Sequence, residues 1–263
     1  GRIAWRLSRR DRRRSLEHLA VAFPELAASA RLGLARGSFE HYGTMLAEAF
    51  WLRHRDREAL SSIVTLEGWE HVEAARVVRR PVLILTGHCG NWEILAAALN
   101  ARGLGMAVIA RELADPGLQE MLLALRERFG TRTIVRGTPG AARVLLSTLR
   151  SGGALGMLID QDTRVDGVFV PFFGRPAYTP VGAAELAQRF DAAVLPVFIE
   201  RLADGTHRGR IEPALALPDD PTAATALMTA RIEAQIRRVP EQWVWLHRRW
   251  RRAPESNSGS RSI

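Results

Sequence analysis

Hydrophobic positions follow two different periods along the chain. In residues 31–52 the apolar side chains, among them Leu34, Phe39 and Met45, fall near one face of a helix. Residues 1–78 read this way throughout. From residue 81 onward, short continuous apolar runs alternate with helical stretches. The pattern therefore predicts an amphipathic helical N-terminal region followed by alternating strands and helices.

The alternation predicts an α/β fold with a central, largely parallel sheet flanked by helices. The expected strands are 81–87, 105–110, 131–135, 154–160, 192–200 and 208–215. The expected helices are 91–102, 116–130, 138–151, 180–190 and 221–239. We expect one domain over residues 1–254, with a helical part at 1–78 and an α/β core at 79–254. The polar residues 255–263 are expected to be disordered.

Charge and composition narrow the possible partners. The 263 residues carry a net charge of +9, and all 37 basic residues are arginine. Such a surface suits nucleic acid, an anionic membrane or an acidic protein. Seven of the first 14 residues are arginine, with Trp5 and Leu7 among them. This segment is typical either of a helix lying on anionic lipid or of a solvated helix terminus.

Membrane-spanning segments and disulfides are not expected. No apolar run approaches the roughly 20 residues that a membrane helix requires. The single cysteine, Cys89, excludes an internal disulfide and fits a reducing compartment. The chain opens on Gly1 and shows no signal peptide. We therefore expect either peripheral attachment or anchoring by an upstream segment.

The candidate chemistry lies where the first predicted strand meets its helix, in LTGHCGNWEILAAAL (residues 85–99). In a parallel sheet, ligands gather beyond the carboxyl ends of the strands. His88 and Glu93 stand at that position. Gly87 and Gly90 supply a flexible turn, and Asn91 is a plausible N-cap for the helix.

An imidazole and a carboxylate at this place suggest general-base catalysis. Glu93 would accept a hydrogen bond from one ring nitrogen of His88, and the other nitrogen would deprotonate a substrate hydroxyl. Backbone N–H groups around Gly90, or an arginine, would stabilise the oxyanion. A structural turn histidine beside a first-turn acid explains the same residues. Cys89 could instead be a nucleophile, although a small buried residue suits it better.

The same spacing of histidine and acid occurs once more, at His207 and Glu212. That segment reads as a strand, in which an odd offset sends two side chains to opposite faces. Geometry therefore excludes it as a catalytic pair.

The chain resembles a known family. TGHCGNWE is similar to the His-x4-acid block of the lysophospholipid acyltransferase superfamily. Four further blocks resemble the late, Kdo-dependent lipid A biosynthesis acyltransferases of bacteria, and the likeness spreads over residues 5–252. These blocks are ARELADPGLQEMLLALRERFG, LIDQDTRVDGVFVPFFGRPAYTPVGAAELAQRF, AAVLPVFIE and PEQWVWLHRRWR.

The resemblance implies a glycerol-3-phosphate acyltransferase-like fold and a reaction. A fatty acyl chain would pass from acyl carrier protein to a hydroxyl of an anionic lipid A precursor, at the cytoplasmic face of the bacterial inner membrane. His88 would be the general base and Glu93 its orienting partner. The resemblance implies no metal, no other cofactor and no covalent acyl-enzyme.

The resemblance also implies a set of substrate-binding residues near the same edge. Arg111 and Arg164 suit acceptor phosphate or an oxyanion, whereas Asp160 and Asp162 suit sugar hydroxyls. A polar turn with a local ion pair explains residues 160–164 equally well. The expected substrate-binding residues are Gly90, Asn91, Arg111, Asp160, Gln161, Asp162 and Arg164.

Two aromatic clusters lie in these blocks. The phenylalanines of FVPFFGRP would line an acyl-chain channel or pack in the core. The tryptophans of PEQWVWLHRRWRR would dock at a membrane interface or be buried at a helix end. The residues concerned are Phe169, Phe172, Phe173, Trp243, Trp245 and Trp250.

Three alternatives to the lipid A reaction stay open at this point. The superfamily includes mycobacterial acyltransferases that acylate phosphatidylinositol mannosides from acyl-CoA. A hydrolase using Cys89 would need no acceptor lipid. A basic nucleic-acid-binding module would explain the arginines, but no recognisable binding motif is present, so no nucleic acid partner is expected.

Overall fold

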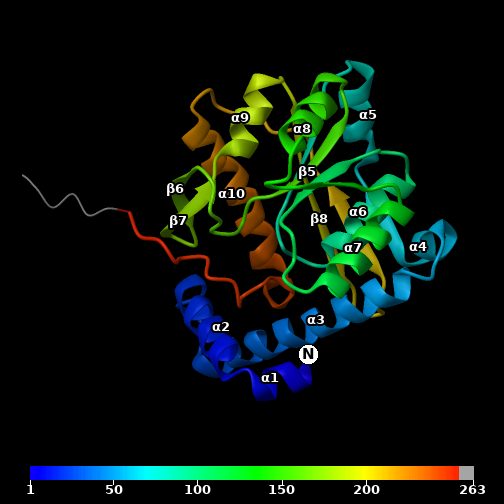
Figure 1. The fold of residues 1–263 in the computed structure, drawn as a ribbon. Coiled ribbons are helices and arrows are strands. Elements are labelled where there is room, and N and C mark those ends of the chain that lie inside the picture. Colours follow the sequence, from blue (N-terminus) through cyan, green and yellow to red (C-terminus); the bar gives the residue numbers. More distant parts are fainter. Residues whose placement is uncertain (255–263) are drawn as a thin grey trace, which may run out of the picture.

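A computed structural model describes residues 1–254 (Figure 1), and the expected tail at 255–263 lies outside the described residues. The core is a seven-stranded sheet in the order β1-β9-β8-β2-β5-β3-β4, in which only the β8–β9 pair is antiparallel. The strands of the sheet are β1 (Val64–Glu67), β2 (Val82–Thr86), β3 (Ala107–Ala110), β4 (Arg132–Val135), β5 (Ala154–Leu158), β8 (Ala193–Arg201) and β9 (His207–Ile211). The expected parallel α/β sheet is therefore confirmed.

Helices cover both faces of this sheet, which is why residues 82–85 of β2 and 193–199 of β8 are apolar without interruption. In β2, Val82 and Ile84 pack into one hydrophobic cluster with α6, while Leu83 and Leu85 pack into a second cluster with α10. The helices are α1 (Arg2–Leu7), α2 (Arg9–Ala22), α3 (Ala28–Leu52), α4 (Arg57–Ile63), α5 (Trp69–Val77), α6 (Trp92–Ala101), α7 (Pro116–Arg128), α8 (Ala141–Arg150), α9 (Gly182–Arg189) and α10 (Pro221–Arg238), with a 3₁₀ turn at Pro240–Gln242.

Three strands differ from the prediction. Val64–Glu67 forms the edge strand β1 inside the region expected to be helical. Its backbone pairs in parallel with β9, and its side chains alternate between half-buried and exposed. A separate antiparallel hairpin, β6 (Gly167–Phe172) and β7 (Arg175–Pro180), was not expected as strands. It contacts α10 and carries two of the phenylalanines into the core.

The N-terminal helices form a layer at one side of the α/β core, with α1 and α2 packed on the long helix α3 (Figure 1). Helix α3 also contacts the 3₁₀ turn, and its Ser38 hydroxyl donates to the carbonyl oxygen of Trp243 at 2.8 Å. Among the described residues, none of the helices combines the length and the apolar character needed to span a bilayer.

Candidate active site

Two neighbouring parallel strands deliver a histidine and an aspartate to the same edge of the sheet. Strands β2 and β5 are in register with Thr86 opposite Leu158. His88 lies two residues beyond β2, and Asp160 lies two residues beyond β5. Equal offsets past paired strand ends bring the two side chains together at the edge where α/β proteins bind ligands.

The carboxylate of Asp160 forms a hydrogen bond with the imidazole of His88. His88 Nδ1 lies 2.8 Å from Asp160 Oδ1, while the backbone N–H of His88 and the indole N–H of Trp243 both donate to Asp160 Oδ2, at 2.8 and 2.7 Å. Burial of Asp160 opposes ionisation, but the charge and hydrogen bonds of His88, with that of Trp243, outweigh it and hold the pKa of this carboxyl below its usual range. Asp160 is therefore an ionised, buried carboxylate.

The ring of His88 remains accessible. Its side chain is 21% exposed, whereas that of Asp160 is 1% exposed. Because Nδ1 faces Asp160, Nε2 is the nitrogen left for a substrate, and no hydrogen-bond partner for it occurs within residues 1–254. The edge of the ring contacts Trp92 at a centroid distance of 4.9 Å, which fixes the ring plane. This arrangement suits a general base with a fixed tautomer.

Two glycines allow the turn that carries His88. A Cβ on Gly87 would lie 2.7 Å from Ile232 Cγ2 and 3.2 Å from the Asp160 carboxyl carbon. Gly90 has φ of +61°, and a Cβ there would collide with the carbonyl oxygen of Ile199. The backbone N–H of Gly90 donates to the carbonyl oxygen of Gln242 at 2.9 Å. It is therefore not free to serve as the expected oxyanion donor.

Glu93 does not form the expected hydrogen bond with His88. It lies in the first turn of α6, is 5% exposed, and receives two hydrogen bonds from Arg126 of α7, at 2.9 Å from Nε and 2.6 Å from Nη2. Burial alone would lower the pKa of Arg126, but its pair with Glu93 raises that pKa above the usual value. The helical turn between positions 91 and 93 rotates Glu93 away from the loop that carries His88, and Asp160 takes the place beside the ring.

The other expected binding residues differ in burial and in whether they form ion pairs within residues 1–254. Arg111, next after β3, and Arg164 are exposed and have no ion pair within residues 1–254, and Gln161 is half-buried. Asp162 is buried and pairs with Arg251 at 3.0 Å and Arg252 at 3.3 Å. The ion pairs of this turn are therefore not local to residues 160–164, because the arginines that Asp162 meets come from the C-terminal segment.

Two aspartates and one asparagine of the expected binding set are buried. Asp160 and Asp162 have no exposed oxygen with which to bind sugar hydroxyls. Asn91 is also fully buried: its Oδ1 caps α6 by accepting from the backbone N–H groups of Glu93 and Ile94, which confirms the expected N-cap. All three side chains are therefore enclosed by the protein in this structure.

The aromatic clusters are mostly core. Phe172, Phe173, Trp243 and Trp245 are buried in the hydrophobic cluster that also contains Cys89, and Trp243 donates to Asp160. Phe169 and Trp250 are half-buried. Core packing, rather than membrane docking or an acyl channel, thus accounts for the four buried rings.

Cys89 is a poor nucleophile in this setting. Its side chain is 2% exposed, and burial, with the nearby charge of Asp160, raises the pKa of the thiol well above its usual value. A thiol must ionise to attack, so the structure does not favour the hydrolase alternative.

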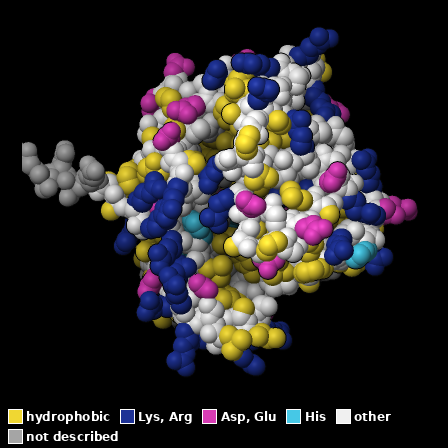
Figure 2. All heavy atoms as spheres, viewed as in Figure 1, with side chains coloured by type: hydrophobic (Ala, Val, Ile, Leu, Met, Phe, Trp, Pro, Cys, Tyr) yellow, Lys and Arg dark blue, Asp and Glu magenta, His cyan; other side chains and the backbone are white. Residues whose placement is uncertain are grey.

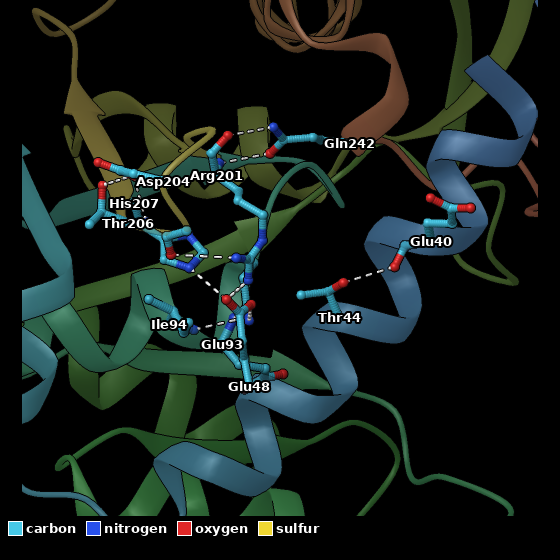
Figure 3. A network of polar contacts seen from close by, with 12 residues as sticks. Glu40, Thr44, Glu48, Glu93, Ile94, Arg201, Asp204, Thr206, His207 and Gln242 are labelled. Atoms are coloured by element: carbon cyan, nitrogen blue, oxygen red, sulfur yellow. Dashed lines mark hydrogen bonds and ion pairs between the residues drawn. The ribbon is translucent and has the colours of Figure 1, made fainter. Parts of the chain in front are cut away.

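Sequence reasoning missed a second polar cluster, which is joined through Asn91 to the turn that carries His88 (Figure 3). Glu48 of α3 accepts from His207 Nε2 at 2.9 Å and from the Asn91 amide at 2.8 Å, and it also pairs with Arg201. Gln242 clamps Arg201 by hydrogen bonds to its backbone N–H and carbonyl. No spacing in the sequence connects Glu48 with the turn, because the two are joined only by the docking of α3.

Fold and site together define the class of protein: an α/β protein with a histidine–aspartate pair at the carboxyl edge of a largely parallel sheet. The chain matches the family described as bacterial lipid A biosynthesis acyltransferase over residues 1–252, and it belongs to that family. It is therefore an acyltransferase.

Curated relatives agree with the family. A lipid A biosynthesis acyltransferase of Haemophilus influenzae is 26% identical over 243 residues, which cover 91% of this chain and 75% of the relative. The lipid A biosynthesis palmitoleoyltransferase of Escherichia coli is 28% identical over 252 residues, covering 92% and 79%. A phosphatidylinositol mannoside acyltransferase of Mycobacterium tuberculosis is 28% identical over 219 residues, covering 81% and 69%.

Proposed function

We propose that this enzyme transfers a fatty acyl chain from the thioester of acyl carrier protein to a hydroxyl of a lipid A precursor. The observation that carries the proposal is the His88–Asp160 pair, placed at the ligand-binding edge of a chain that belongs to the lipid A acyltransferase family. The ring has one nitrogen held by a buried carboxylate and the other free for substrate.

The proposed chemistry is a general-base acyl transfer. His88 Nε2 takes the proton of the acceptor hydroxyl as its oxygen attacks the thioester carbonyl. The tetrahedral intermediate then collapses to an ester, and the leaving thiolate takes the proton back from the imidazolium to become a thiol. Asp160 keeps the proton on Nδ1 and stabilises the imidazolium. Such base assistance contributes about 10²–10⁴-fold to the rate.

Glu93 acts in this proposal as a positioning residue. The pair with Arg126 ties the first turn of α6 to α7, and that turn follows directly on the loop that carries His88. Arg111 and Arg164, exposed and unpaired in the described part of the chain, are proposed to meet anionic groups of the acceptor or the developing oxyanion.

The proposed place of action is the cytoplasmic surface of the bacterial inner membrane. Large apolar side chains stand exposed on the outer layer of helices, including Ile3 and Leu7 of α1 and Phe50 of α3. Arginines of α1 and α2 surround Ile3 and Leu7. Apolar side chains flanked by arginines favour peripheral binding to an anionic bilayer.

A second acceptor is favoured by one observation. The mycobacterial phosphatidylinositol mannoside acyltransferase is as similar to this chain as the Escherichia coli relative is, at 28% identity. The same His88–Asp160 chemistry would then transfer an acyl chain to a mannoside hydroxyl, with acyl-CoA as donor.

A crossed assay separates these possibilities. Purified enzyme is supplied with one of two donors, acyl carrier protein thioester or acyl-CoA. Each donor is combined with a lipid A precursor or a phosphatidylinositol mannoside as acceptor, and the masses of the lipids are measured by mass spectrometry. We expect a gain of one acyl chain on the lipid A precursor with the carrier-protein donor, and none with the His88→Ala variant. Acylation of the mannoside alone would replace the first proposal by the second, and transfer to water alone would refute both.

A further inference from the structure

A strongly cationic groove runs between α2 and the C-terminal segment. Figure 2 shows dark blue side chains gathered over this part of the molecule. Five arginines and one glutamate line the groove, and two of these arginines pair with acids outside the lining, Arg14 with Asp11 at 3.3 Å and Arg251 with Asp162 at 3.0 Å. The lining residues are Arg10, Arg13, Arg14, Glu17, His18, Arg248, Trp250 and Arg251.

Hydrogen bonds hold the two walls of this groove together. Arg14 of α2 donates to the carbonyl oxygen of Leu246 at 3.0 Å, and His18 Nδ1 lies 2.9 Å from the carbonyl oxygen of Trp245. The ring of His18 also meets Trp250 edge-to-face, at a centroid distance of 5.2 Å. The cationic side chains thus project from fixed backbone, which lowers the entropic cost of binding a ligand.

The arginines at the mouth of the groove are available for a ligand. Arg10 and Arg248 have no acidic partner in the described part of the chain, and Arg13 meets only the exposed Glu17, at 3.5 Å. Exposed pairs of this kind contribute little. Guanidinium groups bind phosphate oxygens through paired N–H donors. A phosphate monoester carries up to two negative charges near pH 7, so it gains more from clustered arginines than a singly charged diester does.

The C-terminal wall of the groove is continuous with the catalytic pair. Trp243, at the start of this segment, donates to Asp160, and Arg251, inside the groove, pairs with Asp162. A ligand in the groove therefore lies along the segment that borders the carboxylate of the general base.

We propose that this groove binds a phosphate monoester group of the acceptor lipid and thereby orients the acceptor toward His88. This inference rests on the proposed function, because it names the feature by which the acceptor is recognised. The acceptor is accordingly a lipid with a terminal phosphate, and the same chemistry would also attract free inorganic phosphate.

The kinetic test replaces the arginines without a buried partner and keeps Arg14 and Arg251, which bind other parts of the fold. A triple variant, Arg10→Gln, Arg13→Gln and Arg248→Gln, is compared with a control of equal charge change, Arg136→Gln, Arg143→Gln and Arg150→Gln, on the β4–α8 side of the molecule. With a phosphorylated acceptor, we expect the groove variant to raise KM by about 10- to 100-fold, with kcat changed by less than about twofold. The control variant and a dephosphorylated acceptor should show no such rise.

Three kinetic outcomes would overturn the inference. An equal rise in KM for phosphorylated and dephosphorylated acceptors would show a general charge effect. An equal rise in the control variant would show the same. A rise in KM for acyl carrier protein alone would assign the groove to the acidic donor.

A binding test separates this inference from the proposed reaction. Flotation is measured with phosphatidylcholine vesicles that contain phosphatidic acid, a monoester, or phosphatidylglycerol, a diester, at matched surface charge. We expect tighter binding to the monoester, lost in the groove variant and retained in the control, even if no acyl transfer to lipid A occurs. Equal binding to both vesicles would overturn the inference, as would inorganic phosphate that binds as tightly as the vesicles do.

Discussion

The molecule contains two histidine–carboxylate pairs with nearly the same nitrogen–oxygen distance and different surroundings. His88 Nδ1 lies 2.8 Å from Asp160, and His207 Nε2 lies 2.9 Å from Glu48. The His88 side chain is 21% exposed, whereas the His207 side chain is 0% exposed. Only the first ring can meet a substrate.

The charge on the two carboxylates differs as well. Glu48 is shared with Arg201, which already neutralises it, and burial followed by the charge of Arg201 lowers the pKa of His207 to about 4. Asp160 has no arginine ion pair within the described residues, so its charge remains available to an imidazolium. A histidine–carboxylate pair can act as a base only when the ring is accessible and the carboxylate is not already paired.

The largest difference is expected when each histidine is removed in turn. His88→Ala should lower kcat/KM by about 10³–10⁴-fold, because the base is lost. His207→Gln should leave the rate per folded molecule within about threefold and instead lower the free energy of unfolding by about 1–3 kcal/mol, because Glu48 loses a buried partner. Initial rates and urea unfolding measure the two effects. A His88→Ala enzyme that keeps more than a tenth of its activity would contradict the proposed base.

Substitution of the two carboxylates should also affect the rate differently, with smaller losses than removal of His88. Asp160→Asn keeps the shape but removes the charge that stabilises an imidazolium, so kcat should fall by about 10²-fold. Glu48→Gln should change kcat by less than about threefold. Rates are measured at fixed pH, with unfolding transitions to confirm the fold. Glu93→Gln is the deciding control: if it lowers kcat more than Asp160→Asn does, Glu93 rather than Asp160 supports the base.

Much of the fold was predictable from sequence because local pattern determines it. The continuous apolar run of residues 81–87 and the cap at Asn91 predict β2 and α6, and both are present. The turn that carries His88 followed from the same signals. The strand β1 was missed because four residues with half-buried alternation gain their stability only from pairing with β9.

The partners of the site residues were less predictable, since they depend on strand order. Sequence spacing linked His88 with Glu93, five positions away, whereas the sheet links it with Asp160, 72 positions away. Only the adjacency of β2 and β5 makes that contact, and a single sequence does not give it. Likewise Arg126, which holds Glu93, comes from the neighbouring helix α7.

The two histidine–carboxylate pairs should lose their contributions to stability at different pH values. His207 has a folded pKa of about 4 against an ordinary value of 6.5, so between these values the unfolded chain binds more protons and stability falls as the pH is lowered. The depressed pKa of Asp160 instead gives stability that is present above about pH 4, its ordinary unfolded value, and lost below it.

Between pH 6.5 and 4.5, the free energy of unfolding should therefore decrease by about 1–3 kcal/mol less in the His207→Gln variant than in the unmodified protein. Urea unfolding at a series of pH values measures this slope. Cys89→Ala serves as the matched comparison, because the pKa of its buried thiol is raised and the thiol does not titrate in this range. An unchanged slope in the His207 variant would show that this ring is protonated in the folded protein.

The smallest effect is expected at Cys89, which lies next to His88 in the sequence. Cys89 is buried with a raised pKa, and its backbone bridges to Trp243, so its thiol has no access to substrate. Cys89→Ala should keep kcat within about twofold, and alkylating reagents should leave the folded enzyme active. His88→Ala assayed in parallel shows the loss that a participating neighbour produces. Inactivation by alkylation that is prevented by the Cys89→Ala change would instead bring the thiol into the reaction, and the base would then serve a sulfur nucleophile in place of the acceptor hydroxyl.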